Sequence, residues 1–84
     1  MGELTTLPNI ASTIEQQLNK AGIFTIEQLK IAGSKQAWLK IKAFDPTACY
    51  NRLCSLEGAI HGVRWHYLPE NVKIELKEFY NSHK

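Results

Sequence analysis

Residues 53–65, with the sequence LCSLEGAIHGVRW, contain the signals that decide the fold of this chain. At about 100° per residue, an apolar stripe runs down one face of a helix here. The stripe consists of Cys49, Leu53, Leu56 and Ile60. Ala59 beside it lets another helix approach closely, and Gly62 is expected to end the helix in the left-handed conformation. The stretch therefore predicts a buried helix, followed by a turn that carries Trp65.

Three shorter helices are expected before this one. Two of them are predicted to begin with a capping box, at Ser12 with Glu15 and at Thr25 with Gln28. In a capping box, a hydroxyl and a polar side chain three residues later bind the free backbone N–H groups of the first turn. Each of these two helices is expected to end at a glycine that adopts a positive φ. The two glycines are Gly22 and Gly33.

The remaining helix starts are predicted by polar caps and by prolines. Ser34 is expected to cap the third helix, and Asp45-Pro46 to begin the fourth, with the carboxylate as N-cap and the proline at the first helical position. Leu68-Pro69 opens the fifth helix. No segment shows the alternating pattern of a strand. The prediction is an all-α, single-domain protein over residues 1–84, a compact bundle of about five short helices.

Composition and charge exclude several classes of protein. A chain of 84 residues with 44% hydrophobic and 21% charged residues fits one small globular domain and does not fit a disordered chain. The net charge of +2 permits an anionic partner but is low for a committed nucleic-acid binder. No apolar run is long enough to cross a bilayer or to act as a signal peptide, so we expect a cytoplasmic protein with no membrane partner.

A zinc site is the sharpest chemical alternative that the sequence offers. Its ligands would be Cys49, Cys54, His61 and His66, but their spacing matches no zinc finger or ribbon. We therefore expect two free thiols and no metal or other cofactor. The histidines have no serine or cysteine at nucleophile-like spacing, and no glycine loop could hold a phosphate. We expect neither an enzyme nor a small-molecule substrate.

Two groups of residues together resemble the C-terminal domain of the TfoX/Sxy competence regulators. The first group is Leu7-Pro8-Asn9-Ile10, then Leu18-Asn19-Lys20-Ala21-Gly22-Ile23 and Thr25-Ile26-Glu27-Gln28-Leu29. The second is Leu53, then Leu56-Glu57-Gly58-Ala59-Ile60-His61-Gly62, Trp65 and Leu68-Pro69. The resemblance covers nearly the whole chain.

This resemblance implies a compact helical domain with helix-hairpin-helix (SAM-like) character. In the full-length regulators it follows an N-terminal α/β domain and supports transcription of DNA-uptake genes alongside a cyclic-AMP receptor protein. That N-terminal domain is absent from this sequence, and residues 1–6 are expected to be a short lead-in. The leading hypothesis is a non-enzymatic regulatory or adaptor module that acts by protein–protein interaction or self-association.

The predicted partner-binding residues lie on the third helix. Lys35 and Lys42 are two turns apart with Leu39 between them, so they share a side of the helix. The simpler alternative is a solvated face with one exposed leucine. A larger apolar patch forms only if Ile31 and Ile74, which also lie off the predicted core stripes, converge with Leu39. The exposed edge of the last helix is expected to add contacts.

Weak, non-specific DNA binding is the alternative function. Its candidate residues are Lys20, Lys35, Lys40, Lys42 and Arg64. The first candidate hairpin is Pro8-Asn9-Ile10-Ala11-Ser12. It weakens this hypothesis, because Asn9 and Ala11 stand where a hairpin that binds phosphate usually has glycine.

Glu57 borders the apolar stripe and could act as an acid or base if its pKa were raised. His61 at i+4 and Arg64 beyond the helix end favour a structural role instead, in which Glu57 anchors the turn that carries Trp65. A buried Trp65 ring would also need an acceptor for its indole N–H group.

Overall fold

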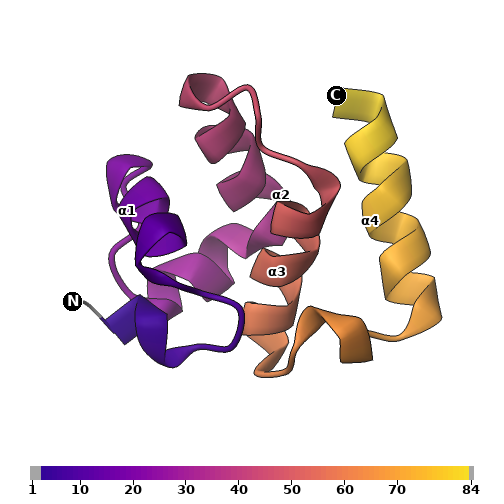
Figure 1. The fold of residues 1–84 in the computed structure, drawn as a ribbon, viewed down its shortest axis with the longest axis horizontal. Coiled ribbons are helices and arrows are strands. Elements are labelled where there is room, and N and C mark those ends of the chain that lie inside the picture. Colours follow the sequence, from indigo (N-terminus) through magenta and orange to yellow (C-terminus); the bar gives the residue numbers. More distant parts are fainter. Residues whose placement is uncertain (1–2, 84) are drawn as a thin grey trace.

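The computed structural model describes residues 3–83, which fold into helices only (Figure 1). The elements are the 3-10 helix η1 (Glu3–Thr6), α1 (Ser12–Lys20), α2 (Ile26–Phe44), α3 (Tyr50–His61), the 3-10 helix η2 (Trp65–Tyr67) and α4 (Glu70–His83). In Figure 1, α3 runs through the middle, with α4 along one side and α1 on the other. The all-α prediction is confirmed. None of the described helices is long and apolar enough to cross a bilayer.

The described chain has four α-helices where about five were predicted. The second and third predicted helices are continuous in α2, which bends at Gly33. Gly33 has φ 82° and ψ 160°, values that only glycine adopts without strain. The predicted stop is therefore a real interruption, but the chain resumes the helix at once instead of forming a loop.

The two predicted capping boxes have different outcomes. The box at Thr25 is confirmed, since the Gln28 N–H group donates to Thr25 Oγ1 at 3.0 Å and the Thr25 N–H group donates to Gln28 Oε1 at 3.3 Å. The box at Ser12 is wrong. Ala11 is the N-cap of α1 and makes no side-chain cap, while Ser12 lies one position inside the helix. Glu15 is consequently turned inward and is buried.

The predicted helix start at Asp45-Pro46 is also wrong. Asp45 instead ends α2, and α3 begins only at Tyr50, after Cys49 as N-cap. The carboxylate of Asp45 accepts the Thr47 N–H group at 3.0 Å and also the Thr47 hydroxyl. An aspartate that binds the backbone two residues ahead stabilises a local turn, which competes with capping a helix.

The core is built around Trp38, which is fully buried on α2. Its Nε1–H group donates to the Cys49 carbonyl at 3.2 Å, and its ring meets Phe79 and Tyr80 of α4 edge-on, with centroids 6.0 and 5.7 Å apart. The core also contains Leu4, so the expectation that residues 1–6 are a mere lead-in is wrong for 3–6. Met1, Gly2 and Lys84 lie outside the described residues.

The predicted inward face of α3 is largely confirmed. Leu53, Leu56 and Ala59 are buried, and Gly62 caps the helix with φ 74°. Cys49 differs, because as the N-cap it is exposed. The sequence pattern does not predict how tightly Gly58 is packed. A Cβ atom there would lie 2.7 Å from Asn9 Nδ2 and 2.8 Å from the Val63 carbonyl oxygen.

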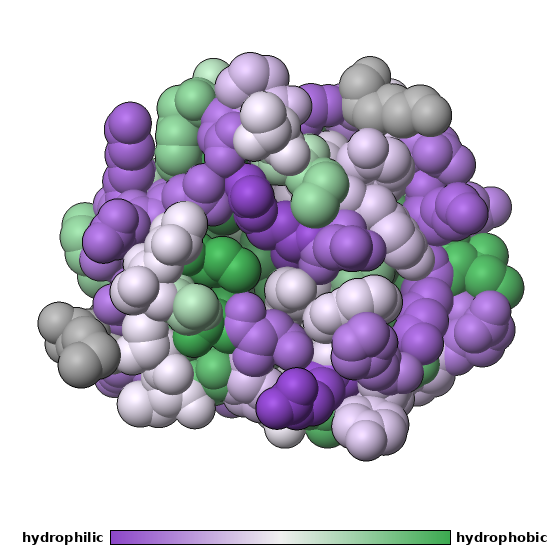
Figure 2. Space-filling model, in the orientation of Figure 1, coloured by the Kyte–Doolittle hydropathy of each residue, from purple (hydrophilic) through white to green (hydrophobic). Residues whose placement is uncertain are grey.

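Hydrophilic side chains cover most of the face seen in Figure 2, and they interrupt the hydrophobic areas between them. The large apolar side chains that remain exposed among the described residues come from separate elements. They are Phe24, Ile31, Val63, Tyr67 and Ile74.

Substituting Gly58→Ala should lower the free energy of unfolding by about 1–3 kcal/mol, because the methyl group must displace the Asn9 amide or the backbone at Val63. Urea denaturation measures the change. Asn51→Ala, at an exposed position on the same helix, should stay within about 0.5 kcal/mol of the wild type. Equal effects of the two substitutions would contradict the close packing.

Candidate functional site

Lys35 and Lys42, two of the predicted partner-binding residues, contact α4 of the same molecule. The Lys35 ammonium pairs with Glu75 at 2.6 Å and lies 5.5 Å from the centroid of the Phe79 ring. Lys42 donates to the His83 carbonyl and lies over the Trp38 ring. The third residue, Leu39, is half-buried against the core, so it forms no exposed patch with Ile31 and Ile74. A role of these residues in binding a partner stays a prediction.

The five cations proposed for DNA binding are divided among different surfaces. Lys20 at the end of α1 lies 4.9 Å from the centroid of the Phe44 ring. Lys40 is exposed, but two residues along a helix it points away from Lys42. Arg64 is exposed in the turn before η2. The structure does not bring the five together on one face.

Glu57 connects the bend of α2 to the end of α3. Its Oε1 accepts the hydroxyl of Ser34, which is buried directly after the Gly33 bend. Its Oε2 lies 2.5 Å from His61 Nε2. The predicted contact with His61 is confirmed. Sequence reasoning missed the contact with Ser34, which was expected to cap its own helix.

The Ser34–Glu57–His61 cluster does not have the order of a serine nucleophile and its base. In such a site a histidine accepts the proton of the serine hydroxyl. Here the hydroxyl donates to Glu57, and His61 contacts the other oxygen of the same carboxylate. The arrangement stabilises the packing of α2 on α3.

The two cysteines are free thiols, with Cys49 exposed and Cys54 buried. Burial raises the pKa of the Cys54 thiol. Burial also raises the pKa of Tyr50 to about 12, and its hydroxyl donates to the Lys73 carbonyl at 3.1 Å. Within residues 3–83, no group of three or more Cys, His, Asp and Glu side chains is arranged to hold a metal ion.

Asn9 holds the turn between α3 and η2 in place. It has φ 69°, the left-handed conformation that asparagine tolerates better than most residues. Its Nδ2 donates to the Val63 carbonyl at 3.0 Å, and its Oδ1 accepts the Trp65 N–H group at 3.4 Å. Asn9 therefore adopts the left-handed conformation for which a glycine was expected, and its side chain also links the N-terminal hairpin to the turn after α3. The Pro-Asn pair was the available sequence signal, but it does not identify the distant partners.

Arg64 lies between the two residues that Asn9 binds, and so beside the first hairpin. A hollow of about 420 Å³ is lined by Arg64 together with Pro8, Asn9, Ile10 and Ala11. Trp65, which follows, is half-buried and stacks on His66 with ring centroids 4.0 Å apart. The structure thus presents a basic and aromatic segment next to a hollow.

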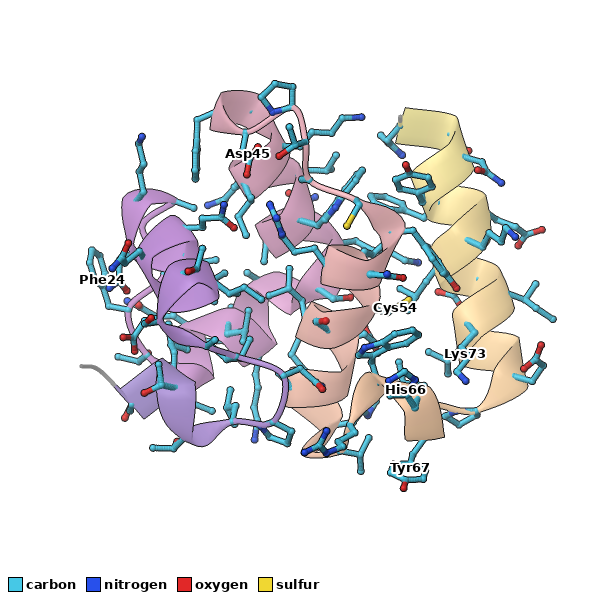
Figure 3. The ribbon with its side chains drawn as sticks, viewed as in Figure 1. Phe24, Asp45, Cys54, His66, Tyr67 and Lys73 are labelled. Atoms are coloured by element: carbon cyan, nitrogen blue, oxygen red, sulfur yellow. The ribbon has the colours of Figure 1, made fainter. Side chains whose placement is uncertain are left out.

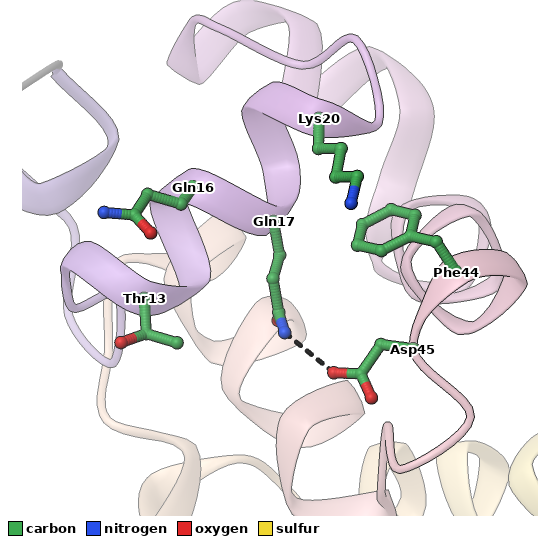
Figure 4. Close-up of a pocket in the computed structure, with 6 residues that line it drawn as sticks. All are labelled: Thr13, Gln16, Gln17, Lys20, Phe44 and Asp45. Carbon is green, nitrogen blue, oxygen red and sulfur yellow. Dashed lines mark hydrogen bonds between the residues drawn. The ribbon is translucent and has the colours of Figure 1, made fainter.

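A second hollow, of about 340 Å³, lies between α1 and the end of α2 (Figure 4). Figure 4 shows Gln17 reaching across to Asp45, which accepts its Nε2–H group at 2.8 Å, while Lys20 extends beside Phe44. Asp45 also pairs with Arg52 at 2.8 Å. Hydrogen bonds from Thr47 and Arg52 lower the pKa of Asp45 to about 2.

These features place the chain among small, all-helical domains. The profile of the TfoX C-terminal domain family matches residues 1–80, and the chain belongs to that family. Protein Sxy of Escherichia coli (strain K12) is 34% identical over 79 residues. The match covers 94% of this chain and 38% of Sxy, so the chain spans well under half of that relative.

Two crystal structures from Listeria monocytogenes have the same fold. An uncharacterized protein in a triclinic crystal form is 52% identical, with a TM-score of 0.93 over 94% of this chain and 90% of that one. A protein of unknown function in a tetragonal form is 50% identical, with a TM-score of 0.95 over 98% of this chain and 100% of that one. Relatives that are 52% and 50% identical therefore share this fold, but these similarities do not indicate an activity.

Replacing Asp45→Asn should destabilise the protein near neutral pH, because Arg52 loses its charged partner. The lowered pKa of Asp45 means that its contribution is complete above about pH 4 and disappears as the pH falls toward 2. Urea denaturation from pH 7 to 2 should therefore show the stabilities of wild type and variant converging at low pH. Glu27→Gln, at an exposed position, should show no such convergence, and a constant gap for Asp45→Asn would contradict the assignment.

Glu57→Gln should lower the free energy of unfolding by about 1 kcal/mol, since the amide has one accepting oxygen in place of the two that Ser34 and His61 contact. For a domain of this size that is a fall of about 4–8 °C in Tm, measurable by circular dichroism. Glu78→Gln on the exposed face of α4 is the control. An unchanged Tm for Glu57→Gln would show that Glu57 does not anchor the two helices.

Proposed function

We propose that this domain is a non-enzymatic regulatory module that acts by binding a protein partner in the cytoplasm, in the control of DNA-uptake genes. Membership in the TfoX C-terminal domain family and the relationship to protein Sxy support the regulatory part. The binding part is carried by one observation. Two large apolar side chains, Phe24 just before α2 and Ile31 within it, are left in solvent.

Phe24 and Ile31 are suited to act together. Phe24 precedes the N-cap of α2 and Ile31 lies in its second turn, so both are near the N-terminal end of that helix. The exposed fractions are 56% for Phe24 and 78% for Ile31. In Figure 3, Phe24 extends away from the body of the molecule. Burying a phenylalanine and an isoleucine against a partner supplies a few kcal/mol of binding energy.

The proposed contact differs from the set predicted on Lys35, Leu39 and Lys42. Those side chains already contact α4 or the core, and a partner would have to compete with these internal contacts. Phe24 and Ile31 need no rearrangement to meet a partner. They can also meet a second copy of the chain, which would give self-association.

The double substitution Phe24→Ser with Ile31→Ser should weaken partner binding at least tenfold and leave the free energy of unfolding within about 1 kcal/mol. Host proteins retained on the immobilised wild-type domain are identified by mass spectrometry, and retention of the same protein is then compared between the variants. Self-association is measured by sedimentation. Ile74→Ser, which removes an exposed isoleucine from α4, is the matched control. Equal retention by wild type and double variant would overturn the proposed contact.

The regulatory part has its own readout in the host cell. Deleting the gene should lower transcription of DNA-uptake genes, and the wild-type domain should restore it where the double variant does not. Normal transcription in the deletion strain would overturn the regulatory role without bearing on the binding surface.

The alternative function, weak DNA binding by a helix-hairpin-helix-like domain, is favoured by the hairpin between η1 and α1. There the positive φ of Asn9 reproduces the conformation of the usual glycine, and its side chain is drawn away toward Val63. Titration into duplex DNA at low salt tests this alternative, and absence of binding there removes it.

A further inference from the structure

A second group of side chains lies where η2 joins α4, and all of its members except the half-buried Lys73 are exposed. It consists of Arg64, His66, Tyr67 and Lys73, and we refer to it as the Arg64–Lys73 surface. Figure 3 shows His66, Tyr67 and Lys73 close together at this junction, with Tyr67 directed outward. The exposed fraction of Tyr67 is 77%, which is unusual for an aromatic side chain with no structural need to face solvent.

The local geometry sets cations beside exposed rings. The Tyr67 N–H group donates to the Arg64 carbonyl at 2.9 Å in the 3-10 turn. Arg64 is the N-cap of η2, in an extended conformation, so the turn brings its backbone next to that of Tyr67. On the other flank, Lys73 Nζ donates to the His66 carbonyl at 2.9 Å and keeps two further N–H groups for a ligand.

The surface is held in place before any ligand arrives. Asn9 binds the residues on both sides of Arg64, at Val63 and Trp65. The His66 ring stacks on the half-buried Trp65, which fixes one face of the ring and leaves the residue exposed. A surface ordered in this way loses less conformational entropy on binding than a flexible loop.

Exposed aromatic faces between fixed cations are the elements that bind unpaired nucleic-acid strands. Bases stack on the rings, and phosphates pair with lysine and with the planar guanidinium of arginine. The hollow of about 420 Å³ beside Arg64, walled by Pro8–Ala11, gives room for the backbone of such a strand. We infer that the Arg64–Lys73 surface binds single-stranded nucleic acid, with bases stacked on Tyr67 and His66 and phosphates on Arg64 and Lys73.

A single strand fits this surface better than a duplex. Bases in a duplex are stacked on one another, so an outward-facing tyrosine cannot take part without opening the helix. Charge alone is also modest here, because Glu70 lines a separate hollow of about 210 Å³ on α4 together with Lys73 and Lys77. Recognition must therefore come largely from the rings. This inference is independent of the protein-binding function proposed above.

Fluorescence anisotropy with labelled oligothymidylate and oligouridylate of about 12 nucleotides tests the inference, and the two strands distinguish DNA from RNA. The full chain should bind at least one strand at low salt and bind a duplex of equal length at least tenfold more weakly. Two phosphate contacts predict a slope of log affinity against log salt of about −1.4.

Tyr67→Ala should weaken single-strand binding about tenfold, whereas Tyr67→Phe should keep it, because stacking needs the ring and not the hydroxyl. Arg64→Ala should weaken binding and make the salt slope shallower by about 0.7. Lys30→Ala, at an exposed position on α2, is the matched charge control and should stay within about twofold. Thermal melting of each variant should be unchanged, since Tyr67 and Arg64 are exposed.

Absence of binding to both strands at low salt would overturn the inference, and so would a Tyr67→Ala variant that binds as well as the wild type. Equal binding to duplex and single strands would also overturn it and would support the hairpin-based alternative. If Tyr67→Ala instead abolishes capture of the host protein, the surface is a protein interface and the inference is wrong. None of these outcomes affects the expected loss of partner binding by the Phe24 and Ile31 double variant.

Discussion

The close approach at Gly58 is the constraint on which much of the architecture depends. The Asn9 amide and the Val63 carbonyl occupy the space that a side chain at residue 58 would need. With that space free, the N-terminal hairpin packs directly against α3, and Asn9 can bind the backbone on both sides of Arg64. The N-terminal hairpin and the turn after α3 therefore meet at one glycine. An α-helix with a larger residue here would hold the hairpin and the turn apart.

Several charged residues of this domain contact neighbouring helices of the same molecule. Lys35 and Lys42 hold α4 against α2, and Glu57 joins the bend of α2 to α3. A small core benefits from such contacts, because it buries little apolar area per residue. The two surfaces proposed for partners are the apolar one at Phe24 and Ile31 and the basic and aromatic one from Arg64 to Lys73.

Local signals in the sequence predicted local structure well where few alternatives compete. Gly22, Gly33 and Gly62 all adopt a positive φ, and the capping box at Thr25 forms as expected. The failure at Asp45 has a physical cause. A short polar side chain can stabilise either a helix start or a turn, and the surrounding packing decides which. Asp45 has Gln17, Thr47 and Arg52 around it, none of which is a local helix signal.

The sequence by itself determined the helical class, the position of most helix ends and the inward face of α3. These properties depend on periodicity and on the backbone preferences of single residues. The sequence also carried the resemblance to the TfoX C-terminal domain. Only the tertiary structure decided that Leu4 belongs to the core, that Glu57 accepts from Ser34, and that Lys35 and Lys42 face α4. It likewise placed Asn9 against the turn of Arg64. Each of these contacts joins residues that lie between 23 and 56 positions apart or buries a side chain beneath another element. The periodicity of a sequence does not indicate which distant segments meet.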